Sequence, residues 1–170
     1  SKTSIARTRY LMADIVFEIN PREFEQLRAK LASGEFARGP AREFVSRSAQ
    51  FLRGEIVKRT PVDTGRLRSS IATRLQDEGL TAVVGSNVQY APHVEFGTRP
   101  HWPPLAAMQP WASRHGFPSG RKGAFLVARA ISRKGTRARR MFQEGMAASE
   151  PFIAAEAAHL LQNIGKEFSS

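Results

Sequence analysis

The pattern of hydrophobic and polar positions predicts a small β-sheet in the first half of the chain. Apolar and polar residues alternate over Leu11–Ile19 and again over Arg66–Gln76, as expected for strands with one buried face. Asp77–Gly79 is a turn signal, after which Leu80–Ser86 is expected to return as an antiparallel strand. The second of these strands has arginines on its polar face, so we expect that face to be exposed.

Apolar residues at helical spacing predict two helices before the second strand. A short helix is expected after Asn20, a residue suited to the N-cap, and it ends at Gly34. A longer helix is expected from near Pro40 to a point before Pro61, because the residue before a proline is pushed out of the helical region. We expect this longer helix to cover one face of the sheet.

The second half of the chain is predicted to be mainly helical. A proline- and glycine-rich stretch, 98–123, is expected to contain one short helix that Pro103 and Pro104 start and that runs through Leu105 to Arg114, with Gly116 as its stop. A loop is expected over Phe117–Gly123. Residues 124–170 are expected to form C-terminal helices, at Ala124–Arg133 and at Ser149–Phe168 with Ser149 as the N-cap. The side chains expected to face inward from these two helices are Phe125, Leu126, Ala128, Ile131, Ile153, Ala157, Leu160, Leu161, Ile164 and Phe168.

These elements predict an α+β fold: a small antiparallel β-sheet covered by a long helix, with additional C-terminal helices. At 170 residues the chain has the length of one domain. We expect residues 1–10 to be an arm that is flexible or ordered by a partner, and residues 11–170 to form a single domain. Residues 87–97, between the sheet and the proline-rich stretch, are expected to be irregular or to form a short helix.

The chain is strongly basic, with 26 lysines and arginines against 15 acidic residues and a net charge of +11. Such a balance implies an acidic partner, either nucleic acid or neighbouring protein. The segment 121–140 holds eight cations and no acid, whereas 141–170 holds four glutamates and one lysine. The chain has no cysteine and no apolar run long enough to cross a bilayer, so it is expected to be soluble and made in the cytoplasm.

Candidate chemistry in the sequence is sparse. His93, Glu95 and His101 form a loose cluster, but their spacing matches no metal motif and surface histidines are the favoured interpretation. No nucleophile motif accompanies the serines and histidines, and the acidic residues of the predicted turns are in exposed contexts. We expect no catalytic residue, no metal site and no cofactor.

Two acidic residues next to arginines suggest a structural role. Asp63 and Glu95 are each close in sequence to arginines, and charge-assisted hydrogen bonds from these could pin two loops together. The arginines in question are Arg66, Arg68 and Arg99. The alternative is that Asp63 caps a turn and Glu95 is solvated, and the sequence leaves both open.

Three segments together resemble a family of tailed-phage proteins. They are TPVDTGRLRSSI (Thr60–Ile71), VGS (Val84–Ser86) and YAPHVEFGT (Tyr90–Thr98), and in this order and spacing they resemble the neck, or tail-completion, family of minor tail components. The matching residues are Thr60, Pro61, Asp63, Thr64, Gly65, Leu67, Ser70, Val84, Gly85, Ser86, Tyr90, Ala91, Glu95, Phe96, Gly97 and Thr98. Family members often have an R-P-F-like element before the final helix, and here Arg139–Phe142 occupies that place without the proline.

The resemblance implies a structural virion protein of the head-to-tail junction, without enzymatic activity or cofactor. It would be made in the host bacterial cytoplasm and incorporated into the particle of a phage, a prophage or a domesticated relative. It would form a cyclic homo-oligomeric ring, a hexamer by family analogy or alternatively a dodecamer, that joins the tail to the head-closure complex. Its partners would be the head-closure or connector protein, the tail terminator or tail tube protein, and the genome DNA passing through the channel; no membrane is involved.

The residues we expect at interfaces are large aromatic or basic and lie in the second half of the chain: Trp102, Trp111, Arg121, Lys122, Arg133, Lys134, Arg137, Arg139 and Arg140. The sequence does not decide whether the basic segment faces DNA or protein. We favour protein, because a cationic channel would hold DNA that must slide. The alternative function is that of an accessory protein that binds nucleic acid without sequence specificity.

Overall fold

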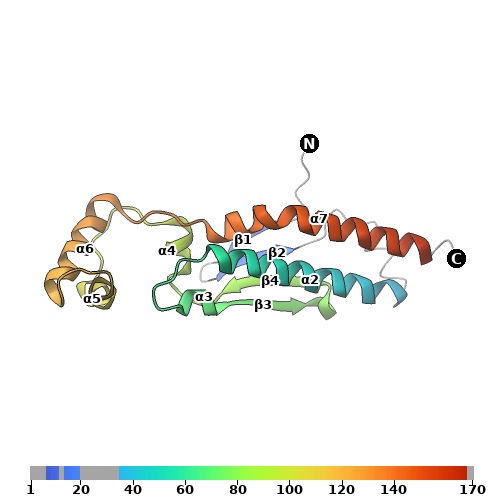
Figure 1. Cartoon of the computed structure of the whole chain (residues 1–170), viewed down its shortest axis with the longest axis horizontal. Helices are drawn as coiled ribbons and strands as arrows, with labels where there is room; N and C mark the ends of the chain where they lie inside the picture. The colour runs from blue at the N-terminus through green and yellow to red at the C-terminus, as the bar shows by residue number, and fades with distance from the viewer. Residues whose placement is uncertain (1–6, 12–13, 20–34, 168–170) are drawn as a thin grey trace.

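A computed structural model describes residues 7–11, 14–19 and 35–167 of the chain. The short helix expected between Asn20 and Gly34 lies outside these residues, as does Phe168. Side chains are described from residue 38 to residue 165. The fold is α+β, as the sequence predicts, with a body at one end and a pair of projecting helices at the other (Figure 1).

The sheet of the body has four antiparallel strands. In chain order these are β1 (Arg7–Leu11), β2 (Asp14–Ile19), β3 (Ile71–Gln76) and β4 (Thr81–Ser86). They lie in the order β1-β2-β4-β3, so β3 is an edge strand. The returning strand β4 and the turn before it, the short 3₁₀ helix η2 (Asp77–Gly79), confirm the predicted hairpin.

The N-terminal part of the sheet differs from the prediction of one strand over Leu11–Ile19. That stretch is divided between β1 and β2, which pair with Arg9 opposite Val16. The expectation that residues 1–10 form a flexible or partner-ordered segment therefore does not hold for the residues of β1. In β1, arginines alternate with Thr8 and Tyr10. Because the segment is so basic, the two-residue repeat typical of a strand was not recognised in the sequence. A single domain over residues 11–170 stays a prediction.

The predicted strand over Arg66–Gln76 is wrong in its first half. Residues Arg66–Ser70 form a short helix, α3, and β3 begins only at Ile71. The hydroxyl of Ser70 donates to the carbonyl oxygen of Leu67 at 2.7 Å, a local bond that favours a helical turn over a ladder. Leu67 and Ile71 are both buried and are four residues apart, a separation that fits one face of a helix as well as one face of a strand. The sequence pattern was therefore interpreted as a strand where the chain forms a helix.

Helix α2 (Glu35–Arg59) covers the sheet, as predicted, but it starts before Pro40. The proline thus lies inside the helix, where it removes one backbone donor without ending the helix. Its buried face contributes a large part of the core, through Phe44, Val45, Ala49, Leu52 and Ile56.

The long C-terminal helix α7 (Met141–Glu167) lies along α2 (Figure 1). It begins eight residues before the predicted N-cap Ser149, whose hydroxyl instead donates to the carbonyl of Gly145 within the helix at 2.8 Å. A Cβ at Gly145 would lie 2.7 Å from a side-chain carbon of Ile56, so the glycine lets the two helices approach closely. The prediction for this helix start is therefore wrong.

Most of the predicted apolar stripe of α7 is confirmed. Its buried members are Ile153, Ala157, Leu160 and Ile164, which join the same core as the α2 residues. Leu161 was also expected to face inward, but its side chain is 45% exposed because it lies at the edge of the buried stripe, about 100° round the helix from Leu160. The core therefore sits between α2, α7 and the inner face of the sheet.

A short helix, α4 (Ala91–Phe96), leads out of the body towards two further helices, α5 (Leu105–Arg114) and α6 (Arg121–Lys134). These two pack on each other and lie apart from the sheet, α2 and α7 (Figure 1). We call residues 98–140, which contain α5, α6 and the two segments that connect them to the body, the arm. Helix α5 has the predicted bounds, and α4 confirms the predicted short element.

Helix α6 begins three residues before the predicted Ala124, and two of its predicted inward residues are wrong. Phe125 and Leu126 are exposed; Ala128 is buried as predicted, and the small residue Ala124 is buried beside it. Small residues let α5 and α6 approach each other closely, and the larger side chains therefore remain on the outside. This rotation matters for the site, because it leaves apolar side chains on the arm surface.

Candidate functional site: the projecting arm

The arm is joined to the body by two segments that cross as a single antiparallel β-bridge. The N–H of Thr98 donates to the carbonyl of Thr136 and the N–H of Thr136 donates to that of Thr98, both at 3.2 Å. Gly97 and Gly135 stand at the crossing, with φ of 69° and 68°. A Cβ at Gly97 would overlap the carbonyl oxygen of Thr136, so glycine is required here both for its backbone conformation and for the close approach.

A second tie joins the arm to the body, and the sequence did not reveal it. Asp63, in the loop before α3, accepts two hydrogen bonds from the guanidinium of Arg114, at the end of α5, at 2.8 and 2.6 Å. This fork-to-fork geometry is the strong form of the arginine–carboxylate pair. The Arg114 hydrogen bonds, with a smaller contribution from its charge, lower the pKa of Asp63, and Asp63 in turn raises the pKa of Arg114. We call this pair the latch.

The hypothesis that Asp63 and Glu95 pair with nearby arginines is wrong for both residues. Arg68 donates to the backbone carbonyl of Thr60 at 3.0 Å instead. The true partner of Asp63 is 51 residues away in sequence, and no local signal points to it. Two exposed members of the proposed set, Arg66 and Arg99, have no acidic partner among the described residues.

Glu95 is buried, with 1% of its surface exposed, and caps the N-terminus of α7. Its two carboxylate oxygens accept the backbone N–H groups of Phe142 and Gln143 at 2.9 and 3.0 Å. A negative charge at this end of a helix is favoured by both the unpaired N–H groups and the helix dipole. The backbone carbonyl of Glu95 also accepts the N–H of Arg140 at 3.0 Å, so the alternative of a solvated Glu95 is wrong as well.

Other residues of the three motif segments also hold the body together. The Thr60 hydroxyl donates to the carbonyl of Ile56 at 2.7 Å at the end of α2, and the Ser70 and Ser86 hydroxyls lie 2.7 Å apart. Met141 and Phe142 are fully buried, so the C-terminal helix docks without the proline of the family element. The motif therefore accounts for how the body is built and where the arm leaves it.

The arm exposes large apolar side chains that a monomer leaves in water. They are Trp102, Trp111, Phe117, Phe125 and Leu126, exposed by 51, 37, 38, 45 and 46%. The Trp102 ring meets that of Phe125 edge-on, with centroids 5.5 Å apart, and Trp111 stacks on His115 at 4.0 Å. Trp111 also lies 6.0 Å from Phe117. A cluster of exposed aromatics of this kind is typical of a surface that binds another protein.

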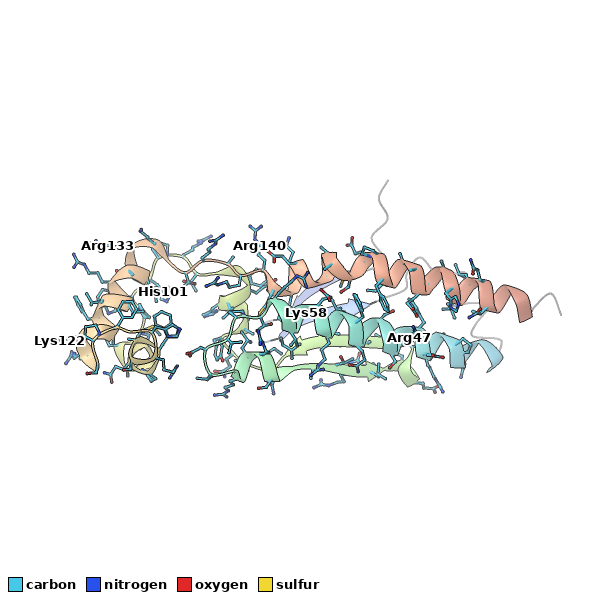
Figure 2. All side chains as sticks on the ribbon, viewed as in Figure 1. Arg47, Lys58, His101, Lys122, Arg133 and Arg140 are labelled. Atoms are coloured by element: carbon cyan, nitrogen blue, oxygen red, sulfur yellow. The ribbon has the colours of Figure 1, made fainter. Side chains whose placement is uncertain are left out.

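The arm is also the most basic part of the molecule. Nine exposed cations in it have no acidic partner among the described residues: Arg99, Arg121, Lys122, Arg129, Arg133, Lys134, Arg137, Arg139 and Arg140. Figure 2 shows Lys122 and Arg133 towards opposite ends of α6, and Arg140 where the chain re-enters the body. All seven basic residues predicted as interface candidates thus lie on the arm surface, together with Trp102 and Trp111. That these residues form an interface stays a prediction.

The described part of the chain shows no group of three or more histidine and acidic side chains placed to hold a metal ion. Within the same residues, no helix is long and apolar enough to span a membrane.

Comparison with known families agrees with this arrangement. Residues 30–97 match the model of the HK97-gp10-like family, described as "Bacteriophage HK97-gp10, putative tail-component". This region is similar to a family of phage tail components, as the motif segments predict. The match covers less than half of the chain: it ends at Gly97, where the arm begins, and it does not include the arm or α7. No curated protein and no solved structure matched the chain.

The family match confirms the coarse form of the functional prediction. The matched family points to a structural component of a phage tail, a class of protein that is located in the virion and interacts with other virion proteins. Its family is a structural one, which accords with the absence of any enzyme motif in the sequence.

Proposed function

We propose that this tail component is a neck, or tail-completion, subunit. It forms a closed homo-oligomeric ring, of six copies or alternatively twelve, that joins the tail to the head-closure complex. The ring surrounds the channel through which the genome DNA passes. Its neighbours above and below are the head-closure or connector protein and the tail terminator or tail tube protein.

The observation that carries the proposal is the arm itself. This two-helix element projects from a packed body and leaves large aromatic side chains exposed to water. A ring requires a surface on each subunit that reaches a different surface on the next, and a projecting element can provide this reach. The match to the tail-component family supplies the virion context.

The proposal assigns the subunit contact to exposed aromatic side chains on and beside α5: Trp102, Trp111 and Phe117. Tryptophans at the centre of an interface commonly contribute about 2 kcal/mol or more each to binding. The latch orients this side relative to the body, because Arg114 is three residues after Trp111 on the same helix.

Trp111→Ser tests the proposal. We expect the midpoint concentration for ring assembly, or for binding to tails, to rise about thirtyfold, since about 2 kcal/mol of contact energy is lost. Mass photometry over a concentration series measures this, and the thermal midpoint of the monomer should change little. Leu161→Ser on α7 is the matched control, because Leu161 is similarly exposed but lies on the body. Equal effects of the two variants would contradict the assignment.

The sequence also allowed a second function, that of an accessory protein binding nucleic acid without sequence specificity. The unpaired cations of the arm are the observation that favours it. Such a protein would remain monomeric, ignore tails and bind any DNA with a steep dependence on salt.

A further inference from the structure

We propose that the outer face of α6 binds the phosphate backbone of duplex DNA. The position of this face at the channel rests on the proposed ring, whereas the binding itself does not. The inference assigns the basic segment to DNA, in contrast to the protein contact that the sequence favoured.

Charge is strongly segregated along the chain. Ten of the 26 lysines and arginines lie in the arm, and none of the 15 acidic residues does. The rest of the chain therefore carries 16 basic residues against 15 acidic ones and is almost neutral, so nearly all of the net charge of +11 belongs to the arm. Of the ten basic residues of the arm, only Arg114, in the latch, is paired with an acidic side chain among the described residues.

Three of the five cations of α6 are placed on one face of the helix. Lys122, Arg129 and Arg133 are seven and four residues apart, which at about 100° per residue puts them within roughly 40° of one another. The stripe they form is about 16 Å long, at about 1.5 Å per residue. The buried side of the same helix, at Ala124, Val127 and Ala128, is on the opposite side. The stripe therefore points away from α5, where a large polyanion can approach it.

The residues after α6 extend this surface. Arg137, Arg139 and Arg140 follow in the segment that returns to the body, and all three are exposed. Arg140 lies at the start of α7 with its side chain directed outward (Figure 2). Exposed cations without acidic partners, on α6 and in the segment that follows it, are the expected footprint of a contact with a phosphate backbone.

A second copy of the chain is a weaker occupant for this surface. The exposed acidic side chains of the body that have no basic partner in the described residues are few and scattered: Glu43, Asp77, Glu144 and Glu150. The body as a whole is almost neutral, with 16 basic residues against 15 acidic ones, so a second copy offers no net negative charge, whereas duplex DNA presents about one negative charge per 1.7 Å of its axis. Charge complementarity therefore favours DNA.

Phosphate contacts also agree with movement of DNA through a channel. Contacts to the backbone carry no sequence information, and proteins bound in this way slide along the duplex. Cations at the channel wall would thus hold the genome in position without blocking its passage.

The test is the binding of the purified full chain to a fluorescent duplex of mixed sequence, followed by anisotropy over a salt series. We expect Arg129→Gln with Arg133→Gln to remove about two phosphate contacts, which lowers the slope of log K against log salt by about 1.8. Between about 50 and about 200 mM salt, the loss of affinity would then be about tenfold smaller than for the wild type.

Arg66→Gln with Arg74→Gln is the matched control, because it removes the same charge from two exposed body residues without acidic partners. We expect it to leave the salt slope nearly unchanged. Equal changes in both double variants, or no binding by the wild type, would overturn the proposal. Displacement of the duplex by poly-glutamate at equal charge concentration would assign the surface to an acidic protein instead.

The two proposals fail separately. Rings that form but do not bind the duplex would overturn the DNA contact and leave the proposed function intact. A chain whose arm binds the duplex but which forms no ring and joins no tail would support the contact and contradict the ring.

Discussion

Glu95 shows how one residue can decide the start of a helix from a distant position. Its carboxylate is buried and bonded to two backbone donors of α7, the nearer of them 47 residues away in sequence. This bond explains why α7 starts at Met141 and not at Ser149, whose local capping pattern the sequence offered. Local patterns could not show this, since the cap comes from another element.

We expect Glu95→Gln to lower the free energy of unfolding by about 2 kcal/mol. An amide can accept from only one of the two donors, and hydrogen bonds to charged groups contribute about 1.5–3 kcal/mol. Urea unfolding followed by circular dichroism measures the loss. Glu150→Gln, at an exposed position in α7 with no basic partner among the described residues, is the control and should have little effect. A loss below about 0.5 kcal/mol would contradict the capping role.

The lowered pKa of Asp63 predicts that the stabilisation provided by the latch depends on pH. Because the pKa of Asp63 is lowered in the folded protein, the stabilisation is complete above the unfolded pKa of about 4 and is lost as the pH falls through the lower folded value. Below that range, we expect the backbone amides of α5 to exchange hydrogen faster, without general unfolding of α2.

Asp63→Asn should produce the same local effect at neutral pH. Hydrogen exchange with mass spectrometry measures it, and Asp77→Asn at an exposed turn is the control. Faster exchange in α2 as well as α5 would show that Asp63 supports the whole fold and not the position of the arm.

At the scale of elements, the sequence predicted best where the signals are local. Helix α5 has the predicted bounds because Pro103 and Pro104 precede its first turn and Gly116 follows its end. The turn at Asp77–Gly79 and the return strand were found for the same reason. The predictions failed for α3 and for the rotation of α6, where a few apolar residues fit both periods or both faces.

The crossing of the two arm segments depends on packing that no local pattern reports. Both Gly97 and Gly135 have a backbone φ near 70° and sit against the opposite segment. The family motif includes Gly97 but gives no reason for it; the structure supplies one, since the place of the missing side chain is occupied by the backbone near Thr136.

We expect Gly97→Ala to be considerably more damaging than Gly116→Ala. Both glycines have positive φ, so each substitution carries a backbone strain of order 1 kcal/mol. Only at Gly97 would the added Cβ also overlap another segment, because Gly116 has open space around it. Thermal unfolding, with hydrogen exchange at Thr98 and Thr136, measures the difference. Equal melting points would contradict the close approach.

At the scale of the whole molecule, the body and the arm differ in charge and in contacts. The body is almost neutral and holds the shared core, whereas the arm carries nearly all of the net positive charge and most of the exposed aromatic side chains of the described residues. The family match lies in the body, within residues 30–97, and stops where the arm starts. The role of a tail component is therefore supported by the body, and the contacts we propose with subunits and DNA belong to the arm.

The most direct test of the central proposal is the mass distribution of the purified chain by mass photometry, with and without particles that lack it. The ring predicts a discrete assembly, six or twelve times the subunit mass, or a monomer that joins tails and restores infectious particles. A chain that stays monomeric at all concentrations, ignores tails and binds added DNA would contradict it.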